Sequence, residues 1–155
     1  MYIFCYIQID NISNVFLDLA INYKFFNLTE FYFLDMIIAT LILMIPITLV
    51  HEIIHGIAYI IFGGKIKFGF KGIYAYTQET CGVILHRTKF AVILLAPVTT
   101  ISLITLFITS SLGSLIFLLN FIGSTGDIIM ATYLCKSNAN SYIKDREYGF
   151  DVIEK

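Results

Sequence analysis

The stretch that decides the fold runs from residue 90 to residue 126 and reads FAVILLAPVTTISLITLFITSSLGSLIFLLNFIGSTG. It lies between Lys89 and Asp127 and contains no Asp, Glu, Lys, Arg or His in 37 residues. One helix of that length would extend about 55 Å, whereas the hydrocarbon core of a bilayer is about 30 Å thick. Small residues around Gly113 favour a turn. We therefore expect two membrane-spanning helices here, joined by a tight turn.

A third apolar stretch precedes these two, over residues 36–62, and it is uncharged apart from the cluster of His51, Glu52 and His55. The chain of 155 residues is 58% apolar and 14% charged, whereas soluble domains have roughly 45–50% and 25%. This composition excludes a disordered chain and a basic nucleic-acid-binding protein. Three such stretches leave too little polar sequence to cover a soluble core, so a polytopic membrane protein is predicted.

The basic residues give an independent test of the number of spans. If three spans alternate, residues 63–89 and 136–155 lie on one side of the membrane, and that side holds nine of the ten basic residues. They are Lys65, Lys67, Lys71, Arg87, Lys89, Lys136, Lys144, Arg146 and Lys155, whereas Lys24 lies on the other side. Loops rich in Lys and Arg stay in the cytoplasm. We therefore expect the 63–89 loop and the C-terminus to be cytoplasmic.

The predicted fold class is mainly α, a single membrane-embedded domain over residues 1–155. Residues 1–34 are expected to form an interfacial N-terminal segment, because residues 11–24 place apolar side chains at helical spacing opposite polar ones. Gly, Tyr, Phe and Thr alternate loosely with polar residues at 64–85, which predicts a β-hairpin. The transmembrane helices are expected at 35–62, 89–110 and 113–136, followed by a polar tail at 137–155 with a short strand at 148–153.

The sequence HEIIH at residues 51–55 carries the chemistry of the first span. His51 and His55 are four residues apart, so on a helix both imidazoles lie on one face and can bind one zinc ion. Glu52 lies one step round the helix, where its carboxylate can take a proton from a water. Ionisable residues in a membrane span cost about 2.5–3.5 kcal/mol each and are usually functional. The alternative, polar side chains that hydrogen-bond between helices, does not explain their metal-ligand order.

A catalytic zinc ion usually has three protein ligands and a water, so a third ligand is needed. We favour Asp127, the only other charge inside the apolar stretches 36–62, 90–110 and 112–135. It lies nine residues before Lys136, and His55 lies eight residues before Gly63. At 1.5 Å per residue, both lie about 12–14 Å below the same membrane surface, where they can meet. Glu79, which is expected in the hairpin, is the alternative third ligand.

Three residues close to Asp127 are further candidates. Gly123 and Gly126 have no side chain beside the carboxylate, so they either let the first span approach or allow the backbone to unwind. Ordinary packing of small residues between helices is the alternative. Asn120 is expected to support a ligand or to bind the substrate backbone, and an interhelical hydrogen bond is the alternative.

Taken together, these motifs resemble a known family. They are HEIIHG in an apolar helix, a Gly- and aromatic-rich hairpin, LLAP in the next span, then GSTGDIIM and a tail with YGF. They are similar to the small bacterial membrane proteins of the putative zincin peptidase family, over roughly residues 33–153. More distantly, the chain resembles the site-2 protease clan of intramembrane metalloproteases, in which an HExxH helix and an Asp on a later helix bind zinc.

The resemblance implies that Zn²⁺ is bound by His51, His55 and Asp127 and that Glu52 is the catalytic base. It implies a zinc metallopeptidase in the bacterial cytoplasmic membrane that hydrolyses a peptide or membrane-protein substrate. The sequence departs from the site-2 protease pattern, because it lacks the Pro-rich NxPxxDG context and Ile128 stands where that pattern has Gly. The alternative function is a non-catalytic zinc-binding membrane scaffold or regulator.

Overall fold

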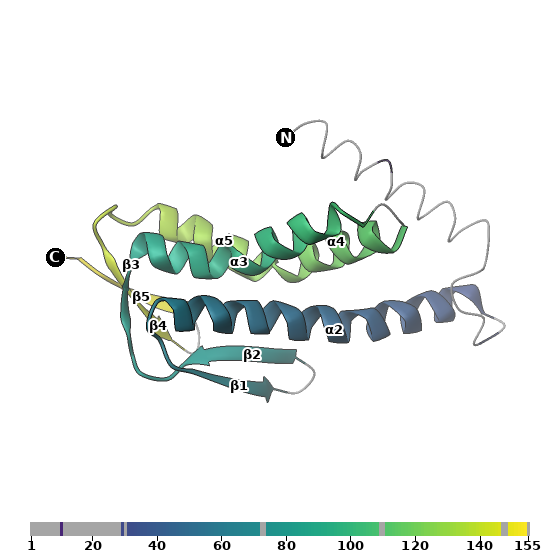
Figure 1. Ribbon diagram of the computed structural model, residues 1–155, viewed down its shortest axis with the longest axis horizontal. Coiled ribbons are helices and arrows are strands. Elements are labelled where there is room, and N and C mark those ends of the chain that lie inside the picture. Colours follow the sequence, from purple (N-terminus) through teal and green to yellow (C-terminus); the bar gives the residue numbers. More distant parts are fainter. Residues whose placement is uncertain are drawn as a thin grey trace.

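The computed structural model describes residues 31–71, 74–108, 111–146 and 149–154, together with Asp10 and Thr29. This part of the chain is mainly helical (Figure 1). Its elements, in chain order, are α2 (Tyr32–Ile61), β1 (Ile66–Lys71), β2 (Tyr74–Glu79), β3 (Ile84–His86), α3 (Arg87–Thr105), α4 (Ser111–Gly123), α5 (Thr125–Cys135), β4 (Tyr142–Arg146) and β5 (Gly149–Ile153). The interfacial segment predicted at 1–34 lies almost entirely outside the described residues.

Helix α2 is the longest element, and it continues through Pro46 without a break. Its 30 residues correspond to a length of about 45 Å. The helix ends where Gly63 adopts a φ of +85°, a left-handed conformation that glycine tolerates best. The amide of Gly64 then donates to the carbonyl of Tyr59 at 2.9 Å, which satisfies a carbonyl in the last turn.

Two described helices, over Phe33–Ile61 and Arg87–Thr105, are each long and apolar enough to cross a membrane. The third span, predicted as one helix over 113–136, consists of two helices, because α4 and α5 meet at Ser124 with a bend of 50°. Together this bent pair is long and apolar enough to cross a membrane as one broken span. Both the amide and the hydroxyl of Ser124 donate to the carbonyl of Asn120 at 2.8 Å. A Ser hydroxyl that bonds back to the preceding turn competes with the helical ladder and bends the helix.

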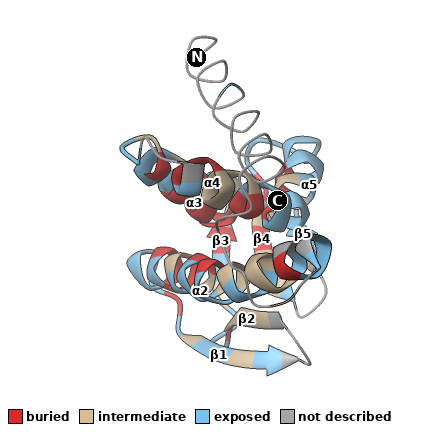
Figure 2. Ribbon diagram, turned by 90° about the vertical axis from the view of Figure 1, so that its right-hand side faces the viewer, coloured by how far each residue is buried: buried red, intermediate tan, exposed pale blue. Residues whose placement is uncertain are grey.

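Strands β1 and β2 are antiparallel, with Ile66 opposite Glu79. They lie along α2 on the side opposite α3, α4 and α5 (Figures 1 and 2). Gly56 of α2 makes this approach possible, because a Cβ there would lie 2.7 Å from Cδ1 of Ile66 and 2.8 Å from Cζ of Phe68. The glycine directly after the HEIIH sequence therefore seats the first strand on the helix.

A second sheet, in the order β3-β4-β5, joins the start of α3 to the C-terminal tail. The strand predicted at 148–153 is confirmed at Gly149–Ile153. The sequence did not reveal β4, and it assigned β3 to the end of the 64–85 hairpin, whereas β3 pairs with β4 through Leu85 and Ile143. These two residues belong to the main buried core, together with Ala58, Tyr59, Phe90, Ile93, Leu94, Ala131 and Leu134.

Candidate metal centre

Helix α2 places two histidines side by side in the interior of the protein. His51 and His55 are one turn apart, and their ring centroids lie 4.8 Å from each other. They are 9% and 8% exposed, so both rings are almost completely removed from the surroundings. The spacing of four residues thus gives the common face that the sequence predicts.

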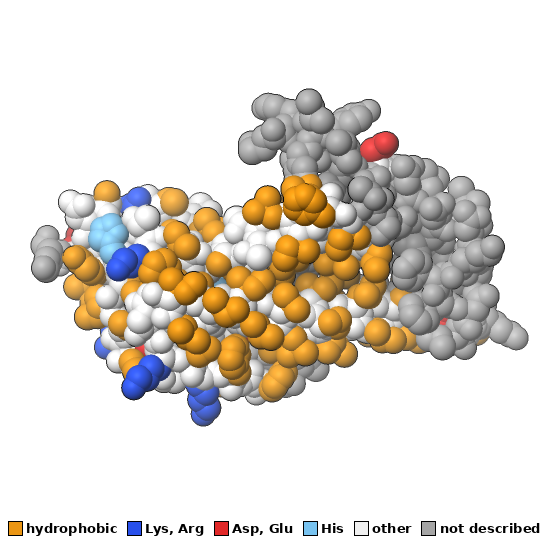
Figure 3. Space-filling model, in the orientation of Figure 1, with side chains coloured by type: hydrophobic (Ala, Val, Ile, Leu, Met, Phe, Trp, Pro, Cys, Tyr) orange, Lys and Arg blue, Asp and Glu red, His pale blue; other side chains and the backbone are white. Residues whose placement is uncertain are grey.

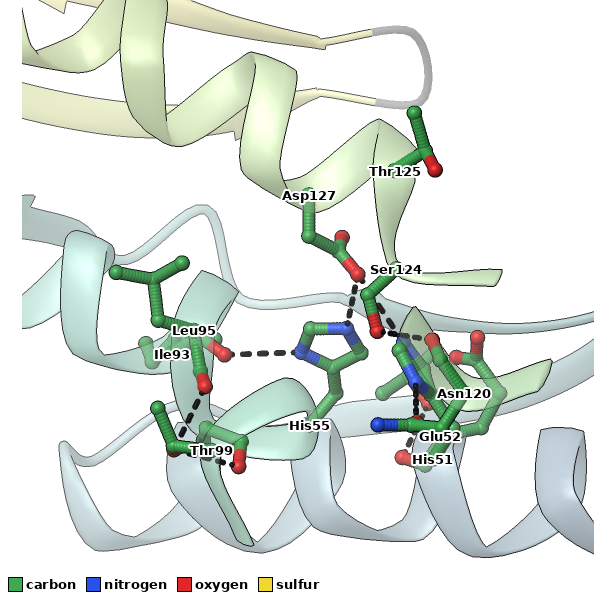
Figure 4. A network of polar contacts seen from close by, with 12 residues as sticks. His51, Glu52, His55, Ile93, Leu95, Thr99, Asn120, Ser124, Thr125 and Asp127 are labelled. Atoms are coloured by element: carbon green, nitrogen blue, oxygen red, sulfur yellow. Dashed lines mark hydrogen bonds and ion pairs between the residues drawn. The ribbon is translucent and has the colours of Figure 1, made fainter. Parts of the chain in front are cut away.

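Asp127 reaches these histidines from the first turn of α5, three residues after Ser124. One carboxylate oxygen, Oδ2, lies 3.1 Å from Nε2 of His51 and 3.4 Å from Nε2 of His55 (Figure 4). One ligand atom from each of the three residues lies within 4.8 Å of the others. The structure therefore brings together the three residues that the sequence singled out as ligands.

The opposite ring nitrogen of each histidine contacts an oxygen atom. Nδ1 of His55 lies 3.0 Å from the backbone carbonyl of Ile93, and Nδ1 of His51 lies 3.4 Å from Oδ1 of Asn120 (Figure 4). A carbonyl oxygen only accepts, so each Nδ1 carries a proton and donates it. In a neutral ring, Nε2 then has no proton and carries a free lone pair.

These contacts leave two nitrogen lone pairs pointing at a carboxylate oxygen. Three acceptors at such short range repel one another unless a proton or a cation lies between them. Ligand atoms 2.0–2.1 Å from a tetrahedral zinc ion lie about 3.3 Å from one another. The two separations from Oδ2, 3.1 and 3.4 Å, match that spacing, and all three ligand atoms lie within 4.8 Å of one another. The donor set therefore fits a zinc ion.

Glu52 lies beside this group and is half-buried. Glu52 lines a cavity of about 230 Å³, together with His55 and Asp127. Its backbone carbonyl accepts a hydrogen bond from the hydroxyl of Thr77 at 2.8 Å. Strand β2 is thus fastened to α2 at the residue predicted to be the catalytic base.

Glu79, the alternative third ligand, is not part of this group. Its buried carboxylate accepts hydrogen bonds from the amide of Cys81 at 2.6 Å and from the amide of Val83 at 3.1 Å. The side chain therefore shapes the loop after β2.

The space beside Gly123 and Gly126 is open. A Cβ at either position would meet no atom of another segment within 4 Å. The backbone changes direction at Ser124, between the two glycines. The role of the two glycines stays a prediction. Asn120, the third candidate close to Asp127, is 1% exposed, and its side chain contacts the predicted ligand His51.

A second polar group, which the sequence does not predict, lies in the same cavity. The hydroxyl of Tyr59 donates to Oδ2 of Asp145 at 2.7 Å, and both residues line the cavity. Burial raises the pKa of the Asp145 carboxyl above its usual range, although the hydrogen bond from Tyr59 opposes that shift. The spacing of four residues from His55 was the only signal for Tyr59, and the local sequence gives none for Asp145.

The family model described as "putative zincin peptidase" matches residues 44–142, which is more than half of the chain. The chain belongs to this family. A zincin family implies zinc, in agreement with the His51, His55 and Asp127 group. Neither a curated protein nor a solved structure gives a significant match. The more distant likeness to the site-2 protease clan stays a prediction.

Proposed function

We propose that this chain is a membrane-embedded zinc metallopeptidase that hydrolyses a bond in a peptide or membrane-protein substrate. The convergence of two Nε2 atoms and a carboxylate oxygen, with Glu52 at the adjoining cavity, carries the proposal. Membership of a zincin peptidase family supports it independently. A non-catalytic scaffold would need the metal group but would have no need of a carboxylate at the cavity.

His51, His55 and Asp127 would hold the metal ion. When bound, zinc supplies Lewis-acid chemistry, which polarises a peptide carbonyl and makes water a stronger acid. The protein contributes the orientation of the ligands, because the carbonyl of Ile93 and the amide oxygen of Asn120 fix which nitrogen of each ring carries the proton.

Glu52 would perform the proton transfers. Its carboxylate takes a proton from the attacking water as the new oxygen–carbon bond forms at the peptide carbonyl. It then delivers that proton to the amide nitrogen as the carbon–nitrogen bond breaks, so that the product leaves as an amine. The half-buried position beside the cavity suits both steps.

The exposed surface of the helices supports the membrane location. Only 12% of the most apolar window of α2 is buried inside the protein, and 33% of that of α3. Soluble proteins rarely expose large continuous apolar patches. In Figure 3 apolar side chains cover the helices, while the Lys and Arg side chains gather at the end that carries the small sheets. Large side chains exposed on α2 and α3 include Leu41, Ile45, Ile53, Ile57, Val92, Leu103 and Ile104.

This distribution also supports the proposed orientation. The 19 residues of α3 correspond to about 28 Å, close to the thickness of a bilayer core. Residues of β2, β4 and β5 line the cavity, so it adjoins the sheet end of the protein. We therefore infer that substrate enters from the basic face, which would be the cytoplasmic face of a bacterial cytoplasmic membrane.

The substitution Glu52→Gln tests the proposal in the protein purified in detergent. It removes the base but none of the three predicted ligands, so zinc content should stay near that of the wild type. Hydrolysis should fall by about 10²–10⁴-fold, the usual contribution of a positioned base. The matched control is Glu154→Gln, the same change at an exposed tail residue, which should hydrolyse like the wild type. A Glu52→Gln variant with wild-type hydrolysis would refute the peptidase and favour the scaffold or regulator.

A further inference from the structure

The cavity beside the metal centre has a second polar group, formed by Tyr59 and Asp145. Tyr59 lies one turn beyond His55 on α2, so its backbone is about 6 Å further along the helix axis. Its hydroxyl donates a hydrogen bond to Oδ2 of Asp145 at 2.7 Å, and Tyr59 is only 5% exposed. The cavity therefore extends from the predicted catalytic residues to a carboxylate that the hydrolysis itself does not use.

The alternation of strand β4 turns Asp145 inward, and no described salt bridge joins it to a basic side chain. Ile143, two residues earlier, is completely buried, and successive residues of a strand point to opposite faces. Lys144 and Arg146 flank Asp145 in the sequence. Arg146 also lines the cavity, and it directs Nε to Asp151 at 2.6 Å. Among the described residues, no Lys or Arg forms an ion pair with Asp145.

The hydrogen-bonding capacity of this group defines what it can bind. Tyr59 donates its only proton to Asp145, so the cavity meets acceptors from both residues. A bound group must then be a donor, and a cation gains most beside a carboxylate that is removed from water. The raised pKa of Asp145 has the same origin, since burial disfavours its negative charge.

The size of the cavity limits the bound group. Its volume of about 230 Å³ is below the range of roughly 300–1,000 Å³ for drug-sized ligands. This leaves room for one side chain or one chain end rather than a long segment.

We propose that Asp145, held by Tyr59, is a specificity-determining residue that binds a cationic nitrogen of the peptide substrate close to the bond that is cleaved. The inference rests on the proposed function, because it places that substrate in the same cavity as Glu52. A Lys or Arg side chain is the favoured source of the cation, and a free amino terminus is the other source of the same chemistry.

Cleavage of a set of N-acetylated peptides by the zinc-loaded wild type tests the inference. Each position is varied among Lys, Gln and norleucine, which compares a cation, a neutral donor and an apolar chain. At one position near the cleaved bond, kcat/KM should be at least about ten-fold higher for Lys than for the other two, the effect of one charge-assisted hydrogen bond. Equal rates for Lys and Gln would overturn the inference.

Variants then assign that preference to a residue. Asp145→Asn keeps an acceptor for Tyr59 and should abolish the preference for Lys. Tyr59→Phe keeps the carboxylate and should retain the preference. Glu154→Gln removes one charge from the exposed tail, outside the residues that line the cavity, and should also retain it. If the preference survives in Asp145→Asn, the inference is wrong while the peptidase stands.

Unacetylated peptides identify the source of the cation. If a peptide with a free amino terminus is cleaved as well as the Lys peptide, and Asp145→Asn no longer cleaves it preferentially, the same site binds the terminal amine.

If the wild type hydrolyses no peptide, the proposed function fails. Binding of the Lys and norleucine peptides to the Glu52→Gln protein, measured by fluorescence anisotropy with and without Asp145→Asn, then decides the inference alone. Equal affinities in that comparison would overturn it.

Discussion

The two faces of helix α2 carry opposite chemistry. On one face His51, His55 and Tyr59 recur every four residues and are 5–9% exposed. On another face Ile53 and Ile57 are 49% and 51% exposed. A surface helix of a soluble protein has the reverse pattern, with its apolar stripe facing the core. The inversion indicates that the inward face of α2 is specialised for polar contacts, while its outward face suits an apolar solvent.

The largest effect is expected from a charge on the apolar face. Ile45, near the middle of α2, is 63% exposed. The substitution Ile45→Lys should disfavour insertion by about 2.5–3.5 kcal/mol, the cost of a charge at the centre of a membrane helix. A glycosylation-based insertion assay of α2 would measure the change, with Ile45→Leu as the control. Unchanged insertion in the Lys variant would show that this face does not meet lipid.

A smaller effect is expected on the polar face, at a residue that is not itself a predicted ligand. Asn120→Ala removes the oxygen that accepts from Nδ1 of His51. Removing such a support usually weakens metal affinity by about 10–100-fold, and zinc titration against a competing chelator would measure this. Thr132→Val is the matched control, because that hydroxyl bonds only to its own helix at Ile128. Equal affinities of Asn120→Ala and the wild type would contradict the role assigned to Asn120.

The smallest effect concerns the pH dependence of stability. Burial raises the folded-state pKa of Asp145, so this group stabilises the fold when protonated and loses that contribution as the pH rises through its folded-state pKa. Asp145→Asn resembles the protonated form. Its Tm in detergent should exceed that of the wild type near pH 7, and the difference should shrink toward about pH 4. A difference that is constant or grows on acidification would contradict the shift.

The sequence predicted the parts of the fold and site that depend on local spacing. Uncharged stretches located the apolar helices, and the interval between His51 and His55 is a property of any helix. The equal depths calculated for His55 and Asp127 agree with their contact at 3.4 Å.

Features that depend on distant or single contacts were not predictable. The β3-β4 pairing joins Leu85 to Ile143, and the Tyr59 hydrogen bond joins residues 86 positions apart. Neither leaves a periodic trace in the sequence. The bend at Ser124 depends on one hydroxyl that turns back to a carbonyl, a choice that composition does not reveal.

Zinc content is the most direct test of the central claim, that α2 and α5 together hold a metal ion. The measurement compares purified wild type with Asp127→Ala, and with Glu79→Gln as the control for a buried carboxylate outside the group. The wild type and Glu79→Gln should contain about one zinc ion per chain, and Asp127→Ala should contain little, because it lacks one of three ligands. Undiminished zinc in Asp127→Ala, or none in the wild type, would contradict this account.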